Sequence, residues 1–202
     1  RVIFAVVYWG VSLLFFVAMG MRNNEHHPLL TKAMMWLGTV WMVFTLYMVL
    51  TTAALDVAHL FIPALHHGVL YALAITTGLL VYGYCNYRNP HVEHITIELD
   101  KPVKGGGVRM VMASDIHLGY GTDRTDLERY VVLINEQKPD VVVIVGDLID
   151  NSITPVVGEN MGEVLDGIEA PDGVYVVPGN HEYISGIDAC ETFIRGTQMT
   201  LL

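Results

Sequence analysis

Three apolar segments of the chain each run into side chains that bind metals well. The segments read VRMVMAS (108–114), DVVVIVG (140–146) and GVYVVPG (173–179), and the side chains that follow them are Asp115, His117, Asp147, Asn180 and His181. Carboxylate, imidazole and amide oxygen together suit Mn²⁺, Fe or Zn²⁺ better than a soft metal. Two such ions held about 3.5–4 Å apart can activate a water molecule and stabilise charge on a phosphoryl oxygen. The sequence therefore favours a site for two divalent metal ions.

The spacing of these residues suits a shared site. Asp115 and His117 are two residues apart, so in extended backbone they point the same way and can bind one cation together. Asp147 follows Gly146, which lets the chain turn sharply, and its two carboxylate oxygens can bridge two metals. Asn180 offers a neutral carbonyl oxygen as a hard ligand. Turn or capping chemistry explains any one motif alone, but three motifs in order at three strand ends favour a metal site.

The elements that must position these residues are strands of one sheet. The stretches between the apolar segments, residues 125–139 and 158–170, are amphipathic helix candidates. Alternating strands and helices with fully apolar strands predict a largely parallel sheet covered on both faces. In such sheets ligands bind at the carboxyl ends of the strands, so the metal-competent side chains should converge. Residues 94–100, HITIELD, alternate apolar and polar and predict a further, half-exposed strand.

The first part of the chain predicts three transmembrane helices. Val2–Gly20, Ala33–Leu55 and Ile62–Cys85 are apolar and free of formal charge, and each has a length near the ~20 residues that a spanning helix requires. Buried soluble helices are the alternative, which three successive charge-free runs disfavour. We therefore predict a membrane domain over residues 1–90 and an α/β domain over residues 91–202.

The basic residues predict an orientation in the membrane. Arg22 and Lys32 lie in the first connection, the second connection carries no Lys or Arg, and the third span is followed by Arg88, Lys101 and Lys104. Positive-inside counting places the first connection and the C-terminal half in the cytoplasm. We expect a multi-pass protein of the cell (inner) membrane whose α/β domain is cytoplasmic.

Four polar residues gather between the second and third spans: Asp56, His59, His66 and His67. A membrane-embedded metal or proton site could be built from them. They fall, however, where a connection should meet headgroups and water, so we expect them to be loop residues.

The net charge and the cysteine content exclude some classes of function. Four basic and two acidic residues give residues 1–90 a charge of +2, and since the whole chain carries −10, residues 91–202 carry −12. Such an acidic surface repels nucleic-acid phosphate, so no nucleic-acid partner is expected, whereas divalent metal binding is favoured. Cys85 and Cys190 have no partner spacing, which argues against a disulfide framework and a thiolate metal site.

The motifs DIH, GDLID and GNHE stand in the order D-x-H, G-D-x-x-D, G-N-H-[DE]. In this the sequence resembles the calcineurin-like metallophosphoesterase superfamily over Ile95–Leu202, and most of all its bacterial membrane-associated branch with N-terminal transmembrane helices. The resemblance implies part of an α-β-β-α sandwich and two divalent metal ions, Mn, Fe or Zn. By it, Asp115 and His117 hold the first metal, Asp147 bridges, and Asn180 binds the second.

The resemblance also implies roles for three neighbours of these ligands. His181 would donate a proton to the leaving-group oxygen or steady the transition-state charge, and Glu182 would orient its imidazole. Asp150, one helical turn beyond Asp147, would support the ligands from behind. Family members carry a later His and a G-H-x-H segment, and no His follows Glu182 here. We expect this chain to be a piece that holds about half of the metal ligands.

Three functions fit the sequence. The first is a membrane-anchored dimetal phosphoesterase that uses a metal-activated water on a phosphomonoester, phosphodiester or pyrophosphate. Its anchoring in membrane lipid suggests a lipid-linked phosphoester substrate. The second is a non-catalytic membrane protein whose phosphoesterase-like domain binds a metal or a partner. The third, a small transporter or sensor, is disfavoured because the spans lack ionisable residues.

Overall fold

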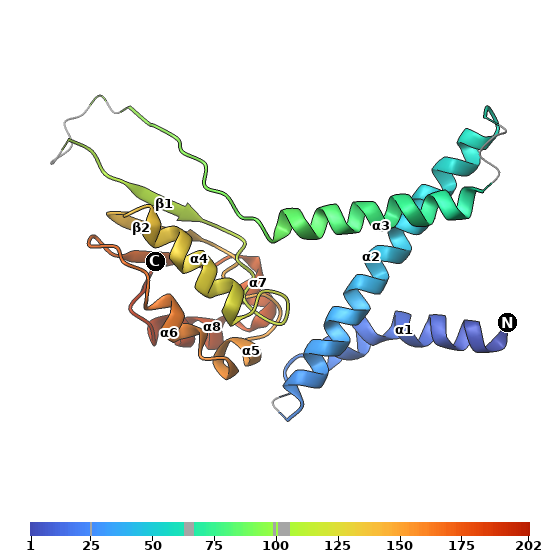
Figure 1. Ribbon diagram of the computed structural model, residues 1–202. Coiled ribbons are helices and arrows are strands. Elements are labelled where there is room, and N and C mark those ends of the chain that lie inside the picture. Colours follow the sequence, from blue (N-terminus) through green and yellow to red (C-terminus); the bar gives the residue numbers. More distant parts are fainter. Residues whose placement is uncertain (25, 63–66, 99, 101–105) are drawn as a thin grey trace. The chain divides into compact units, whose positions relative to one another are not determined.

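The computed structural model describes residues 1–24, 26–62, 67–98, 100 and 106–202 (Figure 1). They form two compact units. The first comprises Arg1–Val17 and Met34–His94, and the second comprises Ala18–Ala33 and Ile95–Leu202. The second unit thus contains the connection between the first two helices as well as the α/β region.

Three long apolar helices begin the chain, as predicted. They are α1 (Val2–Gly20), α2 (Pro28–His59) and α3 (Gly68–Tyr87), and each is long and apolar enough to cross a membrane. Helix α2 extends beyond the predicted Ala33–Leu55 at both ends. At its start, Pro28 is tolerated because a proline in the first helical turn has no N–H partner to lose. The prediction that Asp56 and His59 are loop residues was wrong, since both lie in the last turn of α2. His67 immediately precedes α3, and His66 lies outside the described residues.

Small and polar side chains join the helices of the first unit. A Cβ at Gly38 of α2 would lie 2.5 Å from the backbone nitrogen of Phe15 in α1, so the glycine allows the two backbones to approach closely. The indole N–H of Trp41 donates to Ser12 Oγ over 3.0 Å. This hydrogen bond satisfies two polar groups that lipid could not hydrogen-bond.

The second unit is an α/β domain with a four-stranded parallel sheet, as predicted (Figure 1). Its strands follow one another in the order of the sequence, and neighbouring strands pair in parallel. Its elements are β1 (Met110–Ala113), α4 (Arg124–Glu136), β2 (Val141–Val145), α5 (Thr154–Gly158), α6 (Met161–Leu165), β3 (Val174–Val177), α7 (Asn180–Ser185), α8 (Ile187–Arg195) and β4 (Thr200–Leu201).

One face of this sheet is buried and the other is open among the described residues. Val142, Ile144 and Val176 have no exposed surface and pack in the core. On the other face, Met112 is 68% and Val145 is 43% exposed. The prediction that both faces are covered was therefore wrong for this part of the chain. The physical reason is the strand order: right-handed crossovers between consecutive parallel neighbours place every connecting helix on the same face.

The predicted strand at residues 94–100 is also absent from the described residues of that segment. Ile95 and Ile97 are 81% and 77% exposed, and residues 91–98 have no strand assignment. Alternating polarity suits a sheet surface, but a strand forms only where another strand accepts its backbone hydrogen bonds.

Candidate metal centre

The loops after β1 and β2 adopt an unusual backbone conformation at three of the predicted metal ligands. Asp115, His117 and Asp147 have φ values of 54°, 52° and 53°. Left-handed backbone costs about 1–2 kcal/mol for a residue with a side chain, and such strain clusters at functional sites. The expectation that Asp115 and His117 lie in extended backbone was wrong, because β1 ends at Ala113.

Backbone hydrogen bonds hold these two loops side by side. The N–H groups of Asp115 and His117 donate to the carbonyl oxygens of Gly146 and Asp147 over 3.3 and 2.9 Å, and the Leu118 N–H donates to Leu148 O over 2.8 Å. The tertiary contacts between the loops therefore compensate for the strained conformation. They also bring the side chains of the first two motifs together.

Glu182 joins the third loop to the second. Its carboxylate is 1% exposed and accepts three backbone N–H groups: from Asp147 over 3.1 Å, from Ile149 over 2.8 Å and from Gly179 over 2.6 Å. The last of these is a helix cap, since α7 begins at Asn180. In the structure Glu182 thus binds backbone, whereas the resemblance implied that it orients the His181 imidazole.

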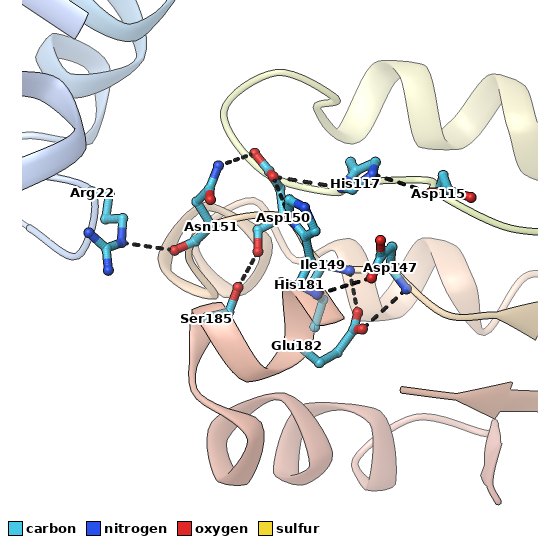
Figure 2. A network of polar contacts seen from close by, with 10 residues as sticks. All are labelled: Arg22, Asp115, His117, Asp147, Ile149, Asp150, Asn151, His181, Glu182 and Ser185. Atoms are coloured by element: carbon cyan, nitrogen blue, oxygen red, sulfur yellow. Dashed lines mark hydrogen bonds and ion pairs between the residues drawn. The ribbon is translucent and has the colours of Figure 1, made fainter. Parts of the chain in front are cut away.

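The group that contacts the His181 imidazole is Asp150 (Figure 2). His181 Nδ1 lies 3.0 Å from Asp150 Oδ1, and the backbone N–H of His181 donates to Asp147 Oδ1 over 3.0 Å. The expectation that Asp150 lies one helical turn beyond Asp147 was wrong, because this stretch is not helical and Ile149 forms a β-bridge with Leu118. This bridge leaves Asp150 facing both His181 and His117.

Five of the predicted site residues form two overlapping groups of ligand atoms. One group is Asp115, His117 and Asp147, the other is His117, Asp150 and His181, and the ligand atoms of each lie within 4.8 Å of one another. His117 belongs to both: its Nε2 lies 3.7 Å from Asp115 Oδ1 and its Nδ1 lies 3.7 Å from Asp150 Oδ1. The rings of His117 and His181 meet edge to face at 4.4 Å.

The arrangement fits a divalent cation on two grounds. His117 Nδ1 is buried and has no hydrogen-bond partner, which is unusual for a polar atom unless it serves a ligand. The donors are carboxylates and imidazoles, which suit Mn, Fe or Zn. Asn180, at the first position of α7, is a neighbour of His181 in sequence. Its part as a metal ligand remains a prediction.

Three residues near the centre were not anticipated from the sequence. Asn151 Nδ2 donates to Asp150 Oδ2 over 2.8 Å, Ser185 Oγ donates to the Asp150 carbonyl oxygen, and the Arg22 Nε–H donates to the Asn151 carbonyl oxygen over 3.1 Å. Asn151 could have been found from its position directly after Asp150. No sequence signal could have found Arg22, because it lies 129 residues away from its partner.

Comparison with known families identifies the domain. Residues 108–198 match the calcineurin-like phosphoesterase family, and this segment contains every residue of the two ligand groups. This part of the chain is similar to that family. The segment that matches a phosphoesterase family is thus the segment that holds the ligand groups.

Relatives of this calcineurin-like domain come from animals and bacteria. The chain is 42% identical over 114 residues to a "Transmembrane protein with metallophosphoesterase domain" of Danio rerio, a match of 55% of this chain and 26% of the relative. It is 33% identical over 134 residues to the "Uncharacterized metallophosphoesterase Cj0846" of Campylobacter jejuni, with 65% and 35% covered. It is 36% identical over 120 residues to the "Uncharacterized metallophosphoesterase YkuE" of Bacillus subtilis, with 57% and 42% covered. The chain thus spans less than half the length of these relatives.

Proposed function

We propose that the protein is a membrane-anchored, metal-dependent phosphoesterase that hydrolyses a phosphomonoester, a phosphodiester or a pyrophosphate. The observation that carries the proposal is the pair of ligand groups that share His117, within a calcineurin-like phosphoesterase domain. The group Asp115, His117 and Asp147 suits one cation, and the neighbouring Asp150 and His181 line the same site. Two divalent ions held there would activate a water molecule and stabilise the charge on the phosphoryl oxygens.

Each ligand has a separate part in this proposal. Asp115 and His117 hold the first ion, Asp147 bridges both, and Asn180 contributes to the second. Support comes from the 3.7 Å separation of His117 Nε2 and Asp115 Oδ1 and from the central place of Asp147, whose Oδ1 accepts the His181 N–H. The donor set is compatible with Mn, Fe or Zn.

His181 is proposed to be the proton donor for the leaving-group oxygen. The contact between His181 Nδ1 and Asp150 Oδ1 supports this part, since a carboxylate fixes the orientation of an imidazole. Glu182 is proposed to hold the loops that carry Asp147 and His181, because its carboxylate binds backbone on both.

The membrane helices suggest where the substrate is found. We propose that the domain is on the cytoplasmic side and acts on a phosphoester linked to a lipid. Arg22 and Lys32 supply positive charge to the first connection, and both contact the phosphoesterase domain. Two segments that contact each other lie on the same side of a membrane, which agrees with an even number of spans between them.

The test uses the native full-length protein in detergent. Hydrolysis of p-nitrophenyl phosphate and bis(p-nitrophenyl) phosphate is measured with Mn²⁺, with Zn²⁺ and with EDTA, beside the variant Asp147→Ala. We expect metal-dependent hydrolysis that EDTA and the substitution abolish. Metal binding without any hydrolysis would favour the non-catalytic alternative. Protease protection in sealed vesicles tests the orientation, and cleavage of the domain from the external side would contradict it.

A further inference from the structure

The connection between α1 and α2 packs on the phosphoesterase domain. Ala18–Ala33 belongs to the same compact unit as Ile95–Leu202. Within this segment Ala18 and Thr31 are fully buried. Two basic side chains of the segment, Arg22 and Lys32, form hydrogen bonds with the domain. The connection is therefore a structural part of the domain and more than a link between two spans.

Lys32 binds two carboxylates on the domain. Its Nζ lies 3.1 Å from Asp123 Oδ2 and 3.2 Å from Glu159 Oε1. Asp123 also caps α4 by accepting the Thr125 N–H over 3.0 Å. Burial alone would raise the pKa of Asp123, but Lys32 and the N–H groups at the start of α4 outweigh it and hold this pKa below its ordinary value. Asp123 thus stays ionised, and the contact persists at neutral pH.

Arg22 contacts two loops of the metal centre. Its Nε–H donates to the Asn151 carbonyl oxygen over 3.1 Å, and Asn151 directly follows Asp150. Its own carbonyl oxygen accepts the Tyr120 hydroxyl over 3.0 Å, and Tyr120 lies three residues beyond His117. Burial raises the pKa of Tyr120, so the hydroxyl remains a donor at neutral pH. Arg22 therefore connects the His117 loop with the Asp150 loop.

A path of hydrogen bonds leads from Arg22 through Asn151 and Asp150 to His181, and a longer contact joins Asp150 to His117 (Figure 2). Arg22 holds the Asn151 carbonyl oxygen, and the Asn151 side chain donates to Asp150 Oδ2 over 2.8 Å. The other carboxylate oxygen of Asp150 lies 3.0 Å from His181 Nδ1 and 3.7 Å from His117 Nδ1. Movement of the Asn151 backbone would shift Asp150 relative to both imidazoles.

We propose that Arg22 is a positioning residue of the metal centre, which fixes the Asp150 loop against the His117 loop and so sets how Asp150 meets the two histidines. Arg22 acts through Asn151 and Tyr120, and it touches no predicted ligand itself. This inference rests on the proposed function as far as turnover is concerned. Its effect on metal affinity follows from the geometry alone, because partners behind the ligands tune how tightly a site binds its metal.

The experiment compares Arg22→Met, Arg22→Lys and Arg195→Met in the native full-length protein. Arg195 is the matched control, since it is an exposed arginine of α8 that pairs with Glu191. Mn²⁺ affinity is measured from the electron paramagnetic resonance signal of free Mn²⁺, and kcat and KM are measured with bis(p-nitrophenyl) phosphate at saturating Mn²⁺. For Arg22→Met we expect about 10-fold weaker Mn²⁺ binding and a lower kcat with unchanged KM. Arg22→Lys, which keeps a charged donor, should recover most of both.

Each contrary result has a definite meaning. Parental Mn²⁺ affinity and kcat in Arg22→Met would overturn the proposal, and so would a raised KM alone, which would make Arg22 a substrate contact. Equal losses in Arg195→Met, or no recovery in Arg22→Lys, would also overturn it. Lys32→Met weakens the attachment of the same segment to the domain but leaves the Arg22–Asn151 hydrogen bond in place. Equal losses of Mn²⁺ affinity and kcat in Lys32→Met would therefore assign the effect to attachment of the whole segment and would overturn the specific role of Arg22. If the parent protein binds Mn²⁺ but hydrolyses nothing, the proposed function fails while the affinity comparison still decides this inference.

Discussion

His181 Nδ1 lies 3.0 Å from Asp150 Oδ1, although Asp150 lies in the loop after β2 and His181 lies in α7, which follows β3. Asp150 also accepts the Asn151 side-chain amide, so both of its oxygens are used. An imidazole held in this way cannot rotate freely. This pair therefore determines how His181 faces a bound phosphoester.

Replacement of Asp150 by Asn should lower turnover. The amide has the same size but no charge, so it holds the His181 imidazole less firmly in place. We expect kcat to fall by about 10–100-fold, measured with bis(p-nitrophenyl) phosphate and Mn²⁺. Asp188→Asn, at an exposed position of α8, is the control and should retain parental turnover. Full activity in Asp150→Asn would refute the role of this pair.

Replacement of Asp147 by Asn should remove metal-dependent activity. A neutral amide is a weaker bridge between two cations than a carboxylate, and we expect a loss of about 100-fold or more in kcat. Insertion into membranes, assayed by carbonate extraction, should not change, because Asp147 lies outside the helices that could span a membrane. Asp172→Asn, at an exposed position, serves as control. Unchanged hydrolysis in Asp147→Asn would disprove the bridging role.

Replacement of Glu182 by Gln should destabilise the domain. The carboxylate accepts three backbone N–H groups, and an amide nitrogen in place of one oxygen leaves a buried donor without an acceptor. We expect a loss of about 1–3 kcal/mol in the free energy of unfolding, measured by thermal unfolding in detergent. Glu191→Gln on the surface of α8 should have little effect. Equal melting temperatures for parent and Glu182→Gln would contradict this account.

Replacement of Gly179 by Ala should disturb the centre sterically. An added Cβ would collide with Asp147, whose backbone nitrogen would lie only 2.5 Å away. Since the φ of Gly179 is −105°, the backbone accepts a side chain and the effect is one of space. We expect weaker Mn²⁺ binding and a destabilisation of about 1–3 kcal/mol. Gly121→Ala, with no atom within 4 Å of the added Cβ, is the matched control. Tight Mn²⁺ binding by Gly179→Ala would show that the loops can separate without loss.

Cys190 should make stability depend on pH in the alkaline range. Burial raises the pKa of this thiol from 9.0 to about 11, with a further contribution from Glu182. The folded state therefore favours the protonated thiol: this stabilisation is complete below pH 9 and is lost as the pH rises towards about 11. The melting temperature should fall more steeply over this interval in the parent than in Cys190→Ala. Identical slopes would contradict the raised pKa.

The ligand motifs and the apolar helices could be predicted because both are local features. The runs that form α1, α2 and α3 need only length and apolar composition to be recognised. The loops of Asp115, Asp147 and His181 follow apolar strand segments, and in a parallel sheet the ends of neighbouring strands meet at one edge. Strand order, by contrast, is a property of the whole sheet, which is why the open face was not foreseen.

What the sequence by itself determined is therefore the kind of protein: apolar helices long enough to span a membrane, a parallel sheet and candidate metal ligands at its carboxyl edge, all set by residue type and short-range spacing. Only the tertiary structure decided how the ligands are held. The left-handed backbone of Asp115 and His117 depends on hydrogen bonds to the loop after β2, and the partners of Glu182 include backbone more than thirty residues away. Arg22 donates a hydrogen bond to Asn151, which lies 129 residues away in the sequence. Such contacts form only when distant segments fold together, and no local pattern of residue types encodes them.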